Sequence, residues 1–216
     1  MSEMRIGRWN RNIHYHDLVL RSVPSGCRHA LDMGCGEGIL SRQLSRYCRD
    51  VTAIDTDEDT LARAIATTGS QASITFLKGD VMTHPFSECS FDFITSVASL
   101  HHLPLTSALK RFRSLLKPGG VLAVIGLYRL HTLRDYSSAA VALPTSMVLR
   151  CVKGFLEVNA PLREPAETLG DIRRACDSLL PGAMLRRELL FRYSMIWRKP
   201  QVSGAENANP ETERTK

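Results

Sequence analysis

A glycine-rich run lies between a strand-like segment and a helix-like segment in the first third of the chain. Its residues are Asp32-Met33-Gly34-Cys35-Gly36-Glu37-Gly38. The apolar stretch 30–33 leads into it, and apolar residues at helical spacing follow it. Glycine allows a backbone to turn sharply and a ligand to approach closely. Ligands of open α/β sheets bind at such junctions, outside the carboxyl ends of the strands. The run therefore predicts a ligand-binding loop.

Strand and helix patterns alternate through the middle of the chain. Short apolar runs typical of strands occupy residues 30–33, 51–54, 74–77, 91–97 and 121–125. The intervening helical spacing predicts one helix with Leu61, Ala62, Ile65 and Ala66, and another with Leu105, Leu109, Phe112 and Leu116. Alternation of this kind indicates parallel strands joined by crossover helices, and hence an open α/β sheet.

The pattern changes after residue 128. A helix over about 167–180 and strands near 184–188 and 190–197 predict an antiparallel finish to the sheet. We expect one domain over residues 1–200. Residues 201–216 are polar and turn-rich, and we expect a disordered tail there.

Composition narrows the functional classes. The 216 residues are 44% hydrophobic and 23% charged, which is typical of a globular protein. The chain has no signal-peptide pattern and no run of about 18 apolar residues, so we expect a cytoplasmic protein without a membrane anchor. The net charge of +6 comes from scattered arginines, which favours a solvated surface and no nucleic-acid partner. Six cysteines without a Cys-x-x-Cys pair argue against a metal site and a disulfide framework.

Two acidic residues follow the glycine run at informative positions. Asp55 ends the second predicted strand, 19 residues after Gly36, where a carboxylate can accept hydrogen bonds from both ribose hydroxyls. Asp80 follows the third strand and can accept from an adenine amino group, with the Val81 amide beside the ring. Each aspartate alone is also a common turn former. The third glycine of an NAD loop is replaced by Ile39, so the spacing disfavours NAD.

Residues 29–126 resemble the core of the class I S-adenosylmethionine-dependent methyltransferases, in the group that acts on small molecules, quinones and lipids. The resemblance rests on Asp32–Gly38, Gly79-Asp80, Leu100-His101-His102 and Leu116-Lys117-Pro118-Gly119-Gly120. It implies a methyltransferase that uses S-adenosyl-L-methionine. It also implies a Rossmann-like, doubly wound sheet of seven mostly parallel strands with the last strand antiparallel.

The resemblance also implies roles for individual residues. Gly34, Gly36 and the Cys35 backbone would contact the methionine part of the cofactor, and Asp32 would order the loop. Asp55 would hold the ribose, and Asp80 with Val81 the adenine. Ser96 and Val97, at the end of the fourth strand, would line the side of the sulfonium.

Two further segments are candidates for contact with the substrate. His101 and His102 lie beyond the fourth strand, where one imidazole could take a proton from a protonated acceptor; alternatively, both shape the loop. Near the N-terminus, His14 or Tyr15 could meet the methionine carboxylate or the substrate. The alternative there is an amphipathic helix that packs Ile13, Leu18 and Leu20 on the sheet.

The acceptor is expected to be a small molecule. Residues 130–165 are apolar and lie where the family usually inserts a substrate lid, which suggests an aromatic or apolar acceptor, although ordinary helix packing explains them equally. The fourth strand runs into Ser96-Val97-Ala98-Ser99-Leu100, and lacks the Asn/Asp-Pro-Pro-Tyr-like run of enzymes that methylate amino groups of nucleic acids and glutamine. An NAD-binding oxidoreductase and a non-catalytic methyltransferase-like binding subunit remain as alternatives.

Overall fold

A computed structural model describes residues 10–69, 73–132 and 164–201 of the chain. Its centre is a seven-stranded sheet in the order β3-β2-β1-β4-β5-β7-β6. The strands are β1 (His29–Met33), β2 (Asp50–Asp55), β3 (Ile74–Lys78), β4 (Phe91–Val97), β5 (Leu116–Leu127), β6 (Met184–Arg187) and β7 (Arg192–Arg198). Strands β1 to β5 pair in parallel, and β7 pairs antiparallel with both β5 and β6. The predicted fold class and the antiparallel finish are confirmed.

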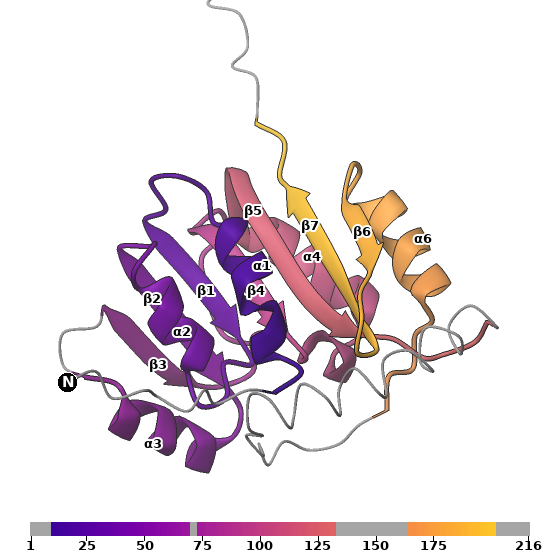
Figure 1. The fold of residues 1–216 in the computed structure, drawn as a ribbon. Coiled ribbons are helices and arrows are strands. Elements are labelled where there is room, and N and C mark those ends of the chain that lie inside the picture. The colour runs from indigo at the N-terminus through magenta and orange to yellow at the C-terminus, as the bar shows by residue number, and fades with distance from the viewer. Residues whose placement is uncertain (1–9, 70–72, 133–163, 202–216) are drawn as a thin grey trace, which may run out of the picture.

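Helices cover both faces of the sheet (Figure 1). The helices are α1 (His16–Arg21), α2 (Ile39–Leu44), α3 (Glu58–Thr67), α4 (Leu105–Leu115) and α6 (Leu169–Leu179), with short 3-10 turns η1 (Ile13–Tyr15) and η2 (Leu100–His102). Helices α1 and α2 bury Val19 and Leu44 against one face of the sheet. Helices α4 and α6 bury Phe112 and Ile172 against the other. Along β5, Leu122 and Val124 enter one core and Ala123 and Ile125 enter the other, as the period of two requires.

Two expected helix faces are corrected. In α3 the buried residues are Thr60, Leu61 and Ala64, whereas Ile65 is 56% exposed. The Asp57 carboxylate caps this helix by accepting from the Thr60 amide at 2.7 Å. In α4 the innermost residues are Ala108, Leu109, Phe112 and Leu115.

The fifth strand also begins earlier than expected. Leu116 pairs with Phe91, and Val121 pairs with Phe93, so the residues between Leu116 and Val121 form an irregular bulge. Gly119 adopts a φ of +78° there, a conformation that glycine tolerates. The Pro-Gly-Gly run therefore bends the start of β5 and does not precede it.

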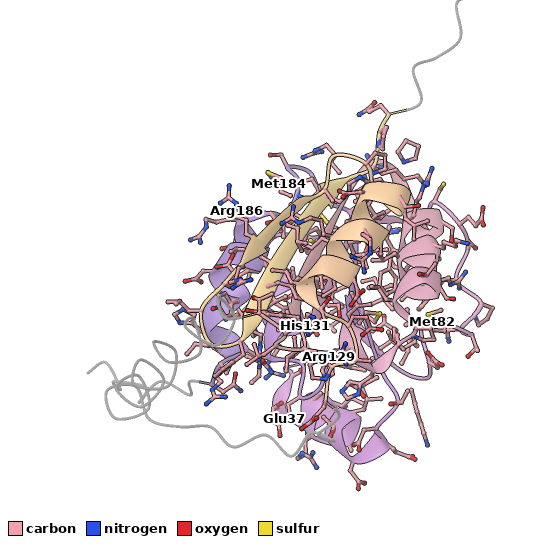
Figure 2. The ribbon with its side chains drawn as sticks, turned by 90° about the vertical axis from the view of Figure 1, so that its right-hand side faces the viewer. Glu37, Met82, Arg129, His131, Met184 and Arg186 are labelled. Atoms are coloured by element: carbon pink, nitrogen blue, oxygen red, sulfur yellow. The ribbon has the colours of Figure 1, made fainter. Side chains whose placement is uncertain are left out.

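The strand order reverses direction at β1. From β1 the chain passes to β2 on one side, while β4 pairs with β1 on the other side. This reversal is the switch point at which open α/β sheets bind ligands. Figure 2 shows Glu37, in the loop after β1, near the end of the molecule where Arg129 follows β5, whereas Met184 at the start of β6 lies away from it.

Candidate functional site

A cavity of about 480 Å³ lies at the switch point. The loops that follow β1, β2, β3 and β4 each contribute to its lining, as does the segment that precedes α1. The volume falls within the range of about 300–1,000 Å³ that is usual for small-molecule and cofactor sites. Because four parallel strands end here, chemistry from distant parts of the sequence meets in one place.

Two glycines of the loop after β1 have different roles. Gly34 has a φ of +66°, and a Cβ there would overlap the Ser99 side chain. Glycine at this position is therefore needed for the loop to pack against Ser99. Gly36 has a φ of +53°, and a Cβ there would meet only the Thr60 methyl group, at 4.0 Å. Gly36 also lines the cavity, so its bare backbone leaves room for a ligand.

The amide groups of this loop already have partners. The amides of Gly34 and Cys35 both donate to the Ile54 carbonyl, at 2.9 and 3.2 Å. The Gly36 amide donates to Asp55 Oδ2 at 2.8 Å. Backbone contacts of Gly34 and Cys35 to a ligand would therefore come from carbonyl groups. Burial raises the pKa of the Cys35 thiol well above its usual range, so this thiol stays protonated.

The Asp55 carboxylate is held on both oxygens. Oδ2 accepts from Gly36, and Oδ1 accepts from the Asp57 amide at 3.1 Å. An ionised carboxylate has about four lone-pair positions, so acceptor capacity remains for a pair of ribose hydroxyls. Asp55 lines the cavity at the end of β2, where the sequence places it.

Asp80 and Val81 line the cavity after β3. Asp80 Oδ1 accepts from the Met82 amide at 2.9 Å, and the Asp80 carbonyl accepts from the His84 amide at 2.8 Å. From α4, the Arg111 guanidinium donates to the carbonyls of His84, at 2.6 Å, and Val81, at 3.5 Å. The turn that could hold an adenine ring is therefore braced by a helix that the sequence motifs do not include.

Asp32 supports the loop from beneath. Its side chain is buried, and Oδ2 accepts from the Ser41 hydroxyl of α2 at 2.6 Å. Burial raises the pKa of Asp32 to about 6; the Ser41 hydrogen bond opposes this shift and the Asp55 charge adds to it. This contact joins the end of β1 to α2, the helix that follows the loop. The role of Asp32 in ordering the loop stays a prediction.

Only part of the expected wall after β4 reaches the cavity. Val97 and His102 line it. The expectation that Ser96 lines the site is corrected, because Ser96 does not line the cavity. It is fully buried, and strand alternation points it to the sheet face opposite to that of Val97. His101 is not among the lining residues either, although its ring lies 4.0 Å from that of His102. Ala98, with a φ of 55°, makes a sharp turn between β4 and η2.

The N-terminal segment contributes different residues from those expected. Among the described residues, the lining includes Asn10, Asn12, Ile13 and His16, and neither His14 nor Tyr15. Positions three apart lie on one face of a 3-10 turn, which explains why residues 13 and 16 share the wall. Tyr15 is buried and its hydroxyl donates to the Leu189 carbonyl at 2.5 Å.

The alternative for this segment, an amphipathic helix that packs Ile13, Leu18 and Leu20 on the sheet, is partly supported. His14 is exposed and packs edge-on against Tyr15. Leu18 and Leu20 pack partly buried on the sheet, as an amphipathic helix requires.

The donor and acceptor groups fit S-adenosylmethionine. Asp55 could hold the ribose, and Asp80 with Val81 the adenine. Open space at Gly36 leaves room for the methionine part. Among the described residues, no group of His, Cys, Asp or Glu side chains is arranged to hold a metal ion.

Two expectations fall largely outside the described residues. These are the lid over 130–165, of which 133–163 are not described, and the tail over 201–216, of which 202–216 are not described. In the described part of the chain, no helix has the length and apolar character needed to cross a membrane.

Comparison with known sequences identifies relatives. A family model described as a methyltransferase domain matches residues 31–124. An uncharacterized methyltransferase of Mycobacterium tuberculosis is 39% identical over 194 residues, which cover 89% of this chain and 98% of that protein. A demethylmenaquinone methyltransferase of Staphylococcus aureus is 35% identical over 100 residues, which cover 44% of this chain and 42% of that protein.

Comparison with solved structures supports the fold. A phosphoethanolamine N-methyltransferase of Haemonchus contortus, in complex with phosphomonomethylethanolamine and S-adenosylhomocysteine, superposes with a TM-score of 0.63. The match covers 87% of this chain and 53% of that chain at 15% identity, so it speaks for the shared architecture alone.

Proposed function

Because this chain belongs to the class I S-adenosylmethionine-dependent methyltransferases, we propose that it methylates a small molecule with an aromatic or apolar body. The observation that carries the proposal is the cavity wall beyond the glycine loop. Val97, Ala98 and Leu103 line this wall, and Ile13 from the N-terminal segment lines the same cavity. Apolar walls with few polar groups are typical of sites for small organic ligands. The partial similarity to a demethylmenaquinone methyltransferase also supports a small-molecule acceptor.

The family assignment replaces the two alternatives of an NAD-binding oxidoreductase and a non-catalytic binding subunit. S-adenosylmethionine supplies an activated methyl group. The residues of this chain bind and orient the two reactants and exclude water. Orientation of two reactants can contribute about 7–11 kcal/mol to such a reaction. We propose that nucleic acid is not the acceptor and that the enzyme acts in the cytoplasm.

We propose His102 as the group that takes the acceptor's proton when the acceptor arrives as a hydroxyl or an ammonium. Two observations support His102 over His101: only His102 lines the cavity, and its amide is tied to the Ser99 carbonyl at 3.1 Å. Its imidazole nitrogen would receive the proton as the acceptor atom takes the methyl group.

An acceptor screen tests the proposed substrate class. The protein, supplied with S-adenosylmethionine, is offered hydroxylated aromatics and quinols, transfer RNA and peptides, and release of S-adenosylhomocysteine is measured. We expect turnover with an apolar aromatic compound. Leu103→Asp should raise KM for that acceptor by about tenfold or more, because the new charge lies in an apolar wall. Ile65→Asp, at an exposed position of α3, is the control. Turnover with RNA or peptide alone would overturn the proposal.

The adjacent histidines provide a matched pair for the proton transfer. His102→Ala should lower kcat by about 10²–10⁴ with unchanged affinity for S-adenosylhomocysteine. His101→Ala should change kcat only a few-fold. Equal kcat values for both variants and the wild type would show that neither imidazole is a base.

A further inference from the structure

Ser99 and His102 line the cavity together, at the two ends of the 3-10 turn that follows β4. We propose that these two side chains bind an amino group, so that the methyl acceptor is an amine carried on the apolar body. The inference rests on the function proposed above, including the role of His102. It goes further by naming the kind of atom that is methylated.

The Ser99 side chain is fixed between two strand ends. A Cβ at Gly34 would lie 2.2 Å from Ser99 Oγ, so this side chain packs directly on the glycine loop after β1. One residue earlier, the Ala98 amide donates to the Ile125 carbonyl of β5 at 2.7 Å. These contacts hold the Ser99 hydroxyl in place before a ligand binds, which reduces the entropy lost on binding.

The Ser99 hydroxyl directs its hydrogen toward the protein. It donates toward the Gly34 carbonyl at 3.3 Å and toward the Val97 carbonyl at 3.2 Å. A hydroxyl has one hydrogen and two lone pairs. In the described part of the chain this oxygen accepts no hydrogen bond, so its lone pairs remain for a ligand. The group that binds there must therefore be a hydrogen-bond donor.

His102 lies on the same face of the turn as Ser99. Positions three apart share a face in a 3-10 turn, and the His102 amide donates to the Ser99 carbonyl at 3.1 Å. In its proposed role His102 accepts a proton, so it also requires a hydrogen on the reacting atom. The two side chains thus offer two acceptors to one ligand group.

Two hydrogen acceptors select the type of reacting atom. An amino group carries at least two hydrogens, so it can donate to Ser99 and to His102 at the same time. A hydroxyl group carries one hydrogen and would leave one acceptor without a partner. A carbon nucleophile would leave both without one. An acceptor that is removed from water and left unpaired costs free energy, so the pair favours nitrogen.

The two residues then have separate roles in the transfer. The nitrogen lone pair forms a bond to the methyl carbon as the carbon–sulfur bond breaks, and the electron pair of that bond stays on sulfur. The nitrogen gains a positive charge and releases one proton to His102. Its other hydrogen stays on Ser99 Oγ. The products are a methylated amine and S-adenosylhomocysteine.

Two probes that differ only in the reacting group test the assignment. 4-Propylaniline carries an amino group, and 4-propylphenol carries a hydroxyl group on the same apolar body. With saturating S-adenosylmethionine, we expect kcat/KM of the wild type to be about tenfold higher for the aniline. Ser99→Ala retains the Cβ that packs on Gly34 and removes the lone pairs. It should lower kcat/KM for the aniline by about tenfold and leave that for the phenol nearly unchanged.

Two controls separate this role from a structural one. Calorimetry should show the same affinity for S-adenosylhomocysteine in Ser99→Ala as in the wild type. Ser90→Ala removes a hydroxyl just before β4, at the opposite end of that strand, where Ser90 Oγ donates to the Ser87 carbonyl at 2.7 Å. This variant should change neither kcat/KM value.

Several outcomes would overturn the inference. One is an equal loss of kcat/KM for both probes in Ser99→Ala, or a loss of affinity for S-adenosylhomocysteine. Another is a wild type that methylates the phenol in preference to the aniline. Where a compound of the acceptor screen is the better substrate, the methylated atom of its product decides: nitrogen supports the inference, and oxygen or carbon overturns it. If the wild type binds S-adenosylhomocysteine but methylates neither a probe nor any apolar compound of the screen, the proposed function itself fails.

Discussion

At the scale of single residues, Asp32 stands out because it is the one buried carboxylate in the described part of the chain. It is 2% exposed, and burial raises its pKa from 3.8 to about 6. The folded state therefore holds this proton more tightly than the unfolded chain does. A raised carboxyl pKa contributes stability that is present below about pH 4 and is lost as the pH rises to about 6.

Asp32→Asn removes this titration and keeps an oxygen that can accept from Ser41. We expect the free energy of unfolding of the variant, relative to the wild type, to rise by up to about 3 kcal/mol between pH 4 and pH 6.5. Urea unfolding at several pH values measures this difference. Asp50→Asn, at an exposed position of β2, is the control. A difference between Asp32→Asn and wild type that does not depend on pH would contradict the shift.

Sequence patterns predict some of the residues in the cavity wall and miss others. Gly36, Asp55 and Asp80 lie where strand ends and spacing predict them, because each occupies a defined place on the backbone. The wall residues Asn12 and His16 could not be predicted, because their partners Arg192 and Gln43 are far away in the sequence. The three-residue spacing of Ile13 and His16 is the one local signal of a shared face.

At the scale of elements, the turn after β3 depends on α4. Arg111 of α4 donates to the carbonyls of Val81 and His84. Arg113 lies two residues further along the helix and donates instead to the Leu179 carbonyl, at 3.2 Å. The two arginines form a matched pair, because Arg111 braces the turn after β3 and Arg113 braces α6.

Arg111→Leu should weaken S-adenosylhomocysteine binding by about tenfold, since a hydrogen bond from a charged group contributes about 1.5–3 kcal/mol. The same variant should speed hydrogen exchange of amides 82–84. Arg113→Leu should leave both quantities unchanged. Calorimetry and hydrogen exchange measure them, and equal effects of the two substitutions would show that Arg111 acts only on overall stability.

The order and type of the elements follow from sequence, but their details do not. Short apolar runs that alternate with helical patterns predict the five parallel strands correctly. Strands that are buried on both faces need such continuous apolar residues. The buried face of α3 was predicted wrongly, because the helix turns Thr60, Leu61 and Ala64 inward and leaves Ile65 56% exposed. The early start of β5 was missed because prolines and glycines usually end an element, whereas here they form a bulge.

At the scale of the whole molecule, the two ends of the described chain meet beside the cavity. Arg192 is bonded to Asn12 and Leu189 to Tyr15, across 180 and 174 residues. The last strand thus supports the segment that closes one wall of the site, while β1 to β4 supply the other walls. No local pattern reveals such pairs, since they arise only once the sheet has assembled.

The central claim is that the cavity at the strand ends binds S-adenosylmethionine through Asp55. The most direct test is titration calorimetry with S-adenosylhomocysteine on the wild type, Asp55→Ala and Asp50→Ala. Both aspartates belong to β2, but Asp50 begins the strand on the exposed surface, while Asp55 ends it in the cavity. We predict that Asp55→Ala loses about 1.5–3 kcal/mol of binding free energy and that Asp50→Ala loses none. Wild-type affinity in Asp55→Ala would contradict the account.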